Sequence, residues 1–196
     1  MEFRLTYRGI LPAGNRAGRT RTRYQRSRDT IQGIRRVFHR QLAVLWQHDL
    51  MASHGQCLDP DYKPDDCFLI ESVGGFRFAP LVTDRLGTLA RVDVLLLRPE
   101  PPGHLLQNPG DLDNRAKTLL DALRMPNRPE ELPDGDQPGD GEDPFFCLLK
   151  DDALVTKLSI DTDTLLDAEN DTDVSVMVRV AIWARSVTFA NMGLIS

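Results

Sequence analysis

The 196-residue sequence contains few cysteines and no long apolar run. Cys57, Cys67 and Cys147 are widely spaced and form no CxxC pair, which favours reduced thiols over a disulfide framework. No apolar stretch approaches the roughly 18 residues that cross a bilayer, and the first residues lack the apolar core of a secretory signal. We therefore expect a cytoplasmic protein that has no membrane partner.

Several common catalytic and metal-binding signatures are also missing. The sequence has neither a glycine-rich phosphate loop nor a serine or cysteine nucleophile motif. Its four histidines show no HxxxH or HExxH spacing, and we expect them on the surface or in helices. His54 with Cys57 and Cys67 lacks the fourth nearby ligand of a structural zinc site. The acidic residues in 161–173 lack the glycine and glutamate that an EF-hand requires.

Charge is distributed unevenly, although the net charge is only −5. Residues 1–40 hold eleven arginines against two acidic residues, and the rest of the chain is strongly acidic. The densest basic stretch, 16–28, has no clear period and is predicted to be an Arg-rich loop that contacts phosphates, unless it is only solvated or is neutralised within the molecule. The proposed nucleic-acid-binding residues are Asn15, just before this stretch, and Arg16, Arg19, Arg21 and Arg23 within it.

A second unusual segment, 126–144, carries seven acidic residues and many prolines and glycines. We call it the acidic insert and expect it to be disordered or a surface loop. Pairing between this insert and the basic stretch would hold a DNA-binding surface closed until DNA competes for it. On that hypothesis, deleting the insert tightens DNA binding and does not weaken folding.

Hydrophobic periodicity predicts two helices among several strands. Apolar residues spaced three or four apart predict helices over 29–50 and 111–124. This order is typical of an α+β fold, and we expect a single domain over 1–196 in which two main helices pack on one mixed β-sheet. The predicted strands are 2–11, 67–73, 76–82, 88–97, 147–160 and 174–183.

The second predicted helix carries the most informative residues. Asp111 and Asp113 stand at its start, and Lys117 follows Asp113 by one turn. Carboxylate oxygens bind hard divalent cations, and a lysine beside a helix N-terminus suits a phosphate. Asp151 and Asp152 precede a predicted strand and are a second source of carboxylates. Such a cage is what metal-assisted phosphodiester hydrolysis needs. Alternatively, Asp111 is a helix cap and Asp113 forms a surface ion pair with Lys117.

The pattern DLDN-x-x-K-x-x-x-DAL, followed after a loop by a DD pair that leads into a strand, resembles the signature of the RusA family of Holliday-junction resolvases. The resemblance implies that Asp111, Asp113 and Asp152 are catalytic metal ligands, with Asp151 as the alternative to Asp152. It also implies that Lys117 is the essential lysine near the scissile phosphate. In a supporting role, Asn114 either orients a ligand carboxylate or stabilises the first helical turn.

By this resemblance the protein is a bacterial or phage-encoded, Mg²⁺-dependent DNA endonuclease with a RusA-like fold. Mn²⁺ is the expected substitute ion, branched DNA such as the Holliday junction is the expected substrate in recombination and repair, and a homodimer is the expected assembly. Two alternatives stay open: a non-catalytic DNA-binding or regulatory protein on the same fold, and a metal phosphohydrolase acting on RNA or nucleotides. The chain is longer than usual for the family, and its acidic insert would repel phosphate unless it folds away.

Overall fold

The computed structural model describes residues 1–12, 21–51, 54–62, 67–101, 111–188 and 191–194. The fold is α+β, as predicted, and none of the described helices is long and apolar enough to span a membrane. Along the chain the helices and strands are β1 (Glu2–Ile10), α1 (Arg21–Trp46), β2 (Glu71–Val73), β3 (Phe76–Val82), β4 (Thr88–Arg98), α3 (Asp111–Leu123), β5 (Phe145–Leu149), β6 (Val155–Thr164) and β7 (Asp173–Ala184). The 3-10 turns are η1 (Asp49–Met51), η2 (Gly55–Leu58), η4 (Pro129–Glu131), η5 (Asp152–Leu154) and η6 (Met192–Leu194).

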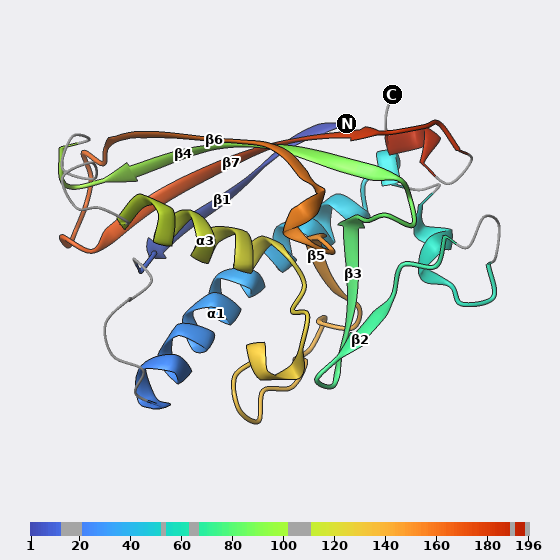
Figure 1. Cartoon of the computed structure of the whole chain (residues 1–196), viewed down its shortest axis with the longest axis horizontal. Coiled ribbons are helices and arrows are strands. Elements are labelled where there is room, and N and C mark those ends of the chain that lie inside the picture. Colours follow the sequence, from blue (N-terminus) through green and yellow to red (C-terminus); the bar gives the residue numbers. More distant parts are fainter. Residues whose placement is uncertain (13–20, 52–53, 63–66, 102–110, 189–190, 195–196) are drawn as a thin grey trace.

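The larger sheet has four strands in the order β1-β7-β4-β6. Only β4 and β6 run parallel; the other neighbours are antiparallel. Alternation along β7 buries Val174, Val176, Val178 and Val180 and exposes Met177 on the opposite face. Both α1 and α3 lie beneath this sheet in Figure 1, and they cover its apolar face.

The smaller sheet has three strands in the order β2-β3-β5, with β3 and β5 parallel. The seven strands therefore form two sheets and not the single predicted one. The cause is a break in the predicted strand 147–160: Asp151 accepts a hydrogen bond from the backbone N–H of Ala153 and caps η5. The chain before this turn joins the smaller sheet, and the chain after it joins the larger one.

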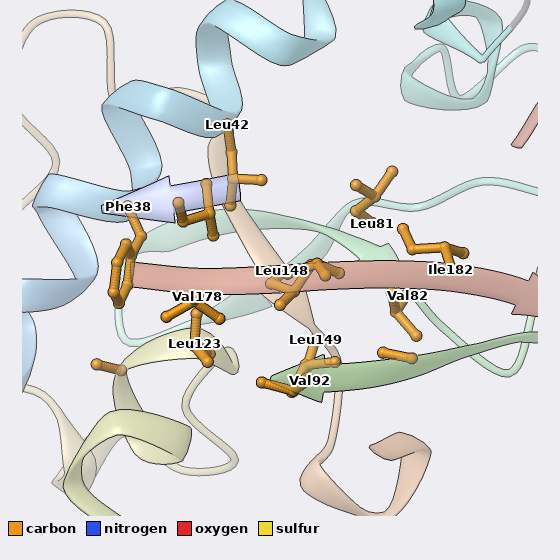
Figure 2. Packing of buried hydrophobic residues seen from close by; sticks show 14 of the residues in the cluster. Phe38, Leu42, Leu81, Val82, Val92, Leu123, Leu148, Leu149, Val178 and Ile182 are labelled. Carbon is orange, nitrogen blue, oxygen red and sulfur yellow. The ribbon is translucent and has the colours of Figure 1, made fainter. Parts of the chain in front are cut away.

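The main core lies where the helices meet both sheets. Figure 2 shows Phe38 of α1 and Leu123 of α3 close to Val178 of β7 and Leu149 of β5. These side chains are at most 1% exposed, so burying them removes nearly their whole apolar surface from water. The core holds α3 in place, and α3 carries most of the predicted site.

Helix α1 begins at Arg21, eight residues before its predicted start, and ends at Trp46. The prediction of an Arg-rich loop is therefore wrong for 21–28, which form the first two turns of α1. Arginine is a good helix former, so a helix can extend through this stretch without an apolar period. Residues 16–20 lie outside the described residues.

The acidic insert is an ordered surface loop, so the alternative prediction of disorder is wrong. Leu132 is 4% exposed and joins a second apolar cluster with Phe76, Phe78, Phe145 and others. Leu132 thus packs the insert against the smaller sheet. The overall composition of residues 126–144 does not reveal a single buried residue of this kind.

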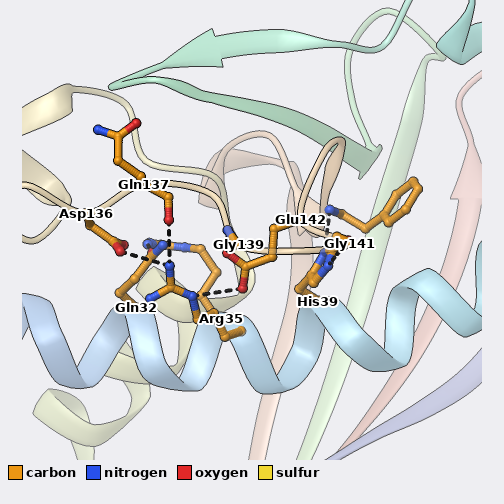
Figure 3. A network of polar contacts seen from close by, with 10 residues as sticks. Gln32, Arg35, His39, Asp136, Gln137, Gly139, Gly141 and Glu142 are labelled. Atoms are coloured by element: carbon orange, nitrogen blue, oxygen red, sulfur yellow. Dashed lines mark hydrogen bonds and ion pairs between the residues drawn. The ribbon is translucent and has the colours of Figure 1, made fainter.

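The insert is also held by arginines of α1. Figure 3 shows Asp136, Gln137 and Glu142 facing this helix. Arg36 lies 2.8 Å from Asp136 and 2.9 Å from Glu142. At the first turns of α1, Arg28 lies 2.9 Å from Asp134 and donates to the backbone oxygen of Leu132. Pairing between basic and acidic segments therefore occurs, but it involves helical arginines and a packed loop.

Candidate active site

The N-terminal half of α3 presents Asp113 and Lys117 to solvent. The opposite side of α3 packs against β4: Leu112 and Leu119 lie beside Val94 and Leu96 around a very small cavity. The side chains of Asp113 and Lys117 make no hydrogen bond or ion pair with any residue that the structure describes. The Asp113–Lys117 surface ion pair that the sequence left open is therefore not formed.

Hydrogen bonds from the same helix fasten the end of β1. Arg115 donates to the backbone oxygen of Leu11. The hydroxyl of Thr118 has one proton to share between the backbone oxygen of Asn114, at 2.9 Å, and that of Pro12, at 3.4 Å. Three residues proposed to bind nucleic acid, Asn15, Arg16 and Arg19, lie outside the described residues, and Arg21 and Arg23 belong to the first turn of α1. Asp111 is the first residue of α3, and its side chain also lies outside the described part.

The pair of Asp151 and Asp152 lies near the other end of α3. Met125, just after this helix, donates its backbone N–H to Leu149 at 2.9 Å, and Arg124 forms a β-bridge with Leu149. Two residues further on, Asp151 caps η5 while the side chain of Asp152 is exposed. The pair therefore follows the point where β5 meets the C-terminal end of α3.

A single chain consequently does not bring Asp113 and Asp152 together. The helix axis between Asp113 and Arg124 is about 16 Å long, because each residue of an α-helix adds about 1.5 Å. Strand pairing also separates the two aspartates. Asp152 lies just before β6, which starts at Val155 opposite Ala90 at the beginning of β4, whereas α3 follows the end of β4 in the chain. Ligands of one Mg²⁺ each lie about 2.1 Å from the ion. Among the described residues no three His, Cys, Asp or Glu side chains gather closely enough to hold a metal.

A different lysine lies beside the aspartate pair and is already engaged. Lys150 lies 3.1 Å from Glu71 and 3.2 Å from Asp84. Burial works against its charge, but the hydrogen bonds to these two carboxylates dominate and raise the pKa of Lys150. This lysine therefore serves as an ion-pair centre between strands, and no sequence pattern indicated it.

Sequence reasoning also missed a pocket between α1 and α3. Its volume is about 280 Å³, and Lys117 connects it to the exposed N-terminal half of α3. Across the pocket lies Arg35, whose side chain is 1% exposed and donates to the backbone oxygens of Asp121 and Arg124 at 2.7 and 3.1 Å. The full lining consists of Ser27, Arg28, Ile31, Arg35, Lys117, Asp121, Arg124 and Glu131.

No family model, curated protein or solved structure matches the chain. The resemblance to the RusA family therefore stays a prediction that rests on the residues of α3 and on the aspartate pair.

Proposed function

We propose that this protein is a Mg²⁺-dependent endonuclease that cuts branched DNA, with Asp111, Asp113 and Lys117 on α3 as its reactive centre. The observation that carries the proposal is the state of Asp113 and Lys117. They are exposed one helical turn apart, and neither has a partner among the residues that the structure describes. A carboxylate and an ammonium in this state are available to a metal ion and to a phosphate.

The carboxylates of Asp111 and Asp113 fit the way in which proteins hold Mg²⁺. This ion commonly binds through one or two carboxylates and keeps water and substrate phosphate as its other ligands. When bound, it supplies positive charge that offsets the charge developing on the phosphate. Lys117 would donate to a phosphate oxygen and stabilise the same charge. Within this proposal Asp113 orients the cation and Lys117 positions the scissile group.

Asp152 needs a separate account, because it lies near the opposite end of α3 in the same chain. We propose a homodimer, and Asp152 contributes to the Asp113 centre only if the second copy supplies it. A two-fold dimer also suits paired cuts in the two strands of a four-way junction.

The test is cleavage of labelled four-way junction, flap, duplex and single-stranded DNA with Mg²⁺, with Mn²⁺ and with EDTA. Asp113→Asn should abolish cleavage and leave DNA binding nearly unchanged. Lys157→Gln is a control outside the proposed centre, because Lys157 pairs with Asp93 on the outer face of the larger sheet, and it should retain activity. Cleavage that persists in Asp113→Asn, or in EDTA, would refute the proposal.

One observation favours a second function, namely non-catalytic DNA binding on the same fold. Asp113 stands at the N-terminal end of α3 whereas Asp152 follows the point where β5 meets its C-terminal end, so one chain keeps these two predicted ligands apart. The same assay decides this: a folded protein that binds junctions but cuts no substrate with either metal is a binding protein. Release of products from RNA or nucleotides, but not from DNA, would instead identify a phosphohydrolase of another class.

A further inference from the structure

We infer that the pocket between α1 and α3 binds a phosphate group of a nucleic-acid strand. The identity of the strand rests on the proposed function, whereas phosphate binding itself does not. The pocket volume of about 280 Å³ lies near the lower end of ligand-binding pockets, which begin at roughly 300 Å³.

Positively charged side chains predominate in the lining of this pocket. Arg28, Arg35, Lys117 and Arg124 line the pocket against only two carboxylates, those of Asp121 and Glu131. Arg124 already contacts both acids, at 2.8 and 2.9 Å. Arg28 likewise pairs with Asp134, which lies outside the lining, at 2.9 Å. Arg35 and Lys117 have no carboxylate partner among the described residues, and these two side chains give the lining its excess of positive charge.

Arg35 provides the second argument. No carboxylate of the described chain lies within ion-pair distance of it; its third hydrogen bond goes to the side-chain oxygen of Gln32 at 2.5 Å. Burial lowers the pKa of Arg35 to about 10, because the charged form has lost water without gaining an anion. A buried cation with only neutral acceptors is costly, and an anion in the adjoining pocket would reduce this cost.

Lys117 provides the third argument. Its side chain reaches this lining from an exposed position and has no partner among the described residues. It also follows Asp113 by one turn. Lys117 is thus both part of this lining and the lysine that we propose for the scissile phosphate, so the pocket and the proposed reactive centre adjoin at this side chain.

A neighbouring pocket has a lining in which carboxylates outnumber cations. On the other side of η4 lies a pocket of about 330 Å³, lined by Arg28 against Glu130, Asp134 and Asp136. That lining carries an acidic excess and should repel phosphate. The net charge of the lining thus differs in sign between the two pockets, which lie on either side of η4. Phosphate binding at one pocket can therefore be compared with phosphate binding at the other.

The first experiment adds inorganic phosphate to the full chain in EDTA at constant ionic strength and follows arginine Nε–H signals by NMR. We expect saturable shifts at Arg35 and Arg124, and no such shift at Arg179, which pairs with Glu2 on the outer face of the larger sheet. Equal shifts at Arg179, or none at Arg35 and Arg124, would overturn the inference.

The second experiment measures the affinity of fluorescent oligonucleotides, with and without a 5′-phosphate, again in EDTA. Lys117→Gln should weaken binding by about tenfold, as expected for loss of one charge-assisted contact. Glu131→Gln should tighten it by about threefold, because an acid leaves the lining while Asp121 still holds Arg124. A preference for the 5′-phosphate assigns a terminal phosphate to the pocket, and equal affinity assigns an internal phosphodiester.

Two matched controls separate an effect of the pocket from an effect of net charge. Lys157→Gln removes the same positive charge as Lys117→Gln, but outside the pocket. Glu130→Gln removes the same negative charge as Glu131→Gln, but from the lining of the neighbouring pocket. If each control changes affinity as much as its partner, the inference is wrong. Phosphate binding in a protein that cuts no DNA would uphold this inference and refute the proposed nuclease, and cleavage without phosphate binding would do the reverse.

Discussion

His39 is a buried residue whose protonation state is set by the backbone around it. Its Nδ1 accepts from the N–H of Phe146 at 2.9 Å, so the proton must lie on Nε2, which donates to the oxygen of Gly141 at 3.0 Å (Figure 3). The ring also stacks on Phe145 with centroids 4.4 Å apart. The neutral imidazole therefore connects α1 to the end of the acidic insert.

We predict that this histidine makes the fold less stable in mild acid. Burial lowers the pKa of His39 below its ordinary 6.5. The unfolded chain then binds a proton more readily than the folded chain, so this contribution to stability is complete above pH 6.5 and falls as the pH drops toward the folded pKa. Urea denaturation between pH 7.5 and 5 should show the loss.

His39→Gln should flatten this pH dependence, because an amide has no titrating proton. His48→Gln is the control, since His48 is exposed and lies two residues after the end of α1, and it should keep the wild-type slope. An unchanged slope in His39→Gln would show that other groups cause the acid sensitivity.

Some residues were predictable from the sequence and some were not. Alternation in the strand ending at Ala184 puts even-numbered residues inside, so Trp183 faces outward and is 38% exposed. Residue type alone would favour the core for both tryptophans, and only Trp46 is buried. Arg35 was not predictable, because its acceptors lie 86 and 89 residues away.

At the scale of elements, the acidic insert is a packed part of the fold and not a loop that can be deleted without loss of stability. Deleting it would expose the cluster around Phe76 and Phe145 and would remove the partners of Arg28 and Arg36. The expectation that deletion spares folding therefore conflicts with the structure. Ion pairs of this kind contribute modestly, so Leu132 is the anchor to test.

We predict that Leu132→Ala destabilises the protein by about 3 kcal/mol, as expected for a buried leucine whose removal leaves a cavity. The measurement is the midpoint and slope of equilibrium urea unfolding. Leu166→Ala makes the same chemical change at a side chain that is 94% exposed, and it should change stability by less than about 0.5 kcal/mol. Equal effects would mean that the insert is not fastened through Leu132.

Regular elements were predictable where one face carries a clear period. The strand 76–82 is found as predicted, and α3 differs by one residue, because apolar spacing fixes both. The break between β5 and β6 had a local signal as well, since consecutive aspartates favour caps and turns. It was missed because the flanking residues are apolar and continue an extended pattern.

At the scale of the molecule, the positions of the four predicted catalytic residues depend on topology. The sequence placed Asp111, Asp113 and Lys117 on one helix, and the structure agrees. The distance from Asp113 to Asp152 depends on the direction in which α3 returns beside the sheet. Local sequence patterns do not determine that direction. The spacing of the residues along the chain therefore could not show that Asp113 and Asp152 lie near opposite ends of α3.

This separation yields a test of how the proposed site is assembled. If a homodimer completes each site with Asp152 of the partner, mixing inactive Asp113→Asn with inactive Asp152→Asn should restore activity. Random exchange makes half of the dimers mixed, and each mixed dimer has one intact site and one doubly altered site. About a quarter of the wild-type sites should therefore be active, because a two-fold dimer contains two equivalent sites.

The control is a mixture of Asp113→Asn with Lys117→Gln. These residues share one helix, so no mixed dimer regains an intact centre, and activity should stay absent. If the Asp113→Asn and Asp152→Asn mixture also stays inactive after confirmed subunit exchange, Asp152 does not act across a dimer. If Asp152→Asn alone keeps full activity, the reactive centre consists of residues at the N-terminal end of α3, and Asp152 only supports the start of β6.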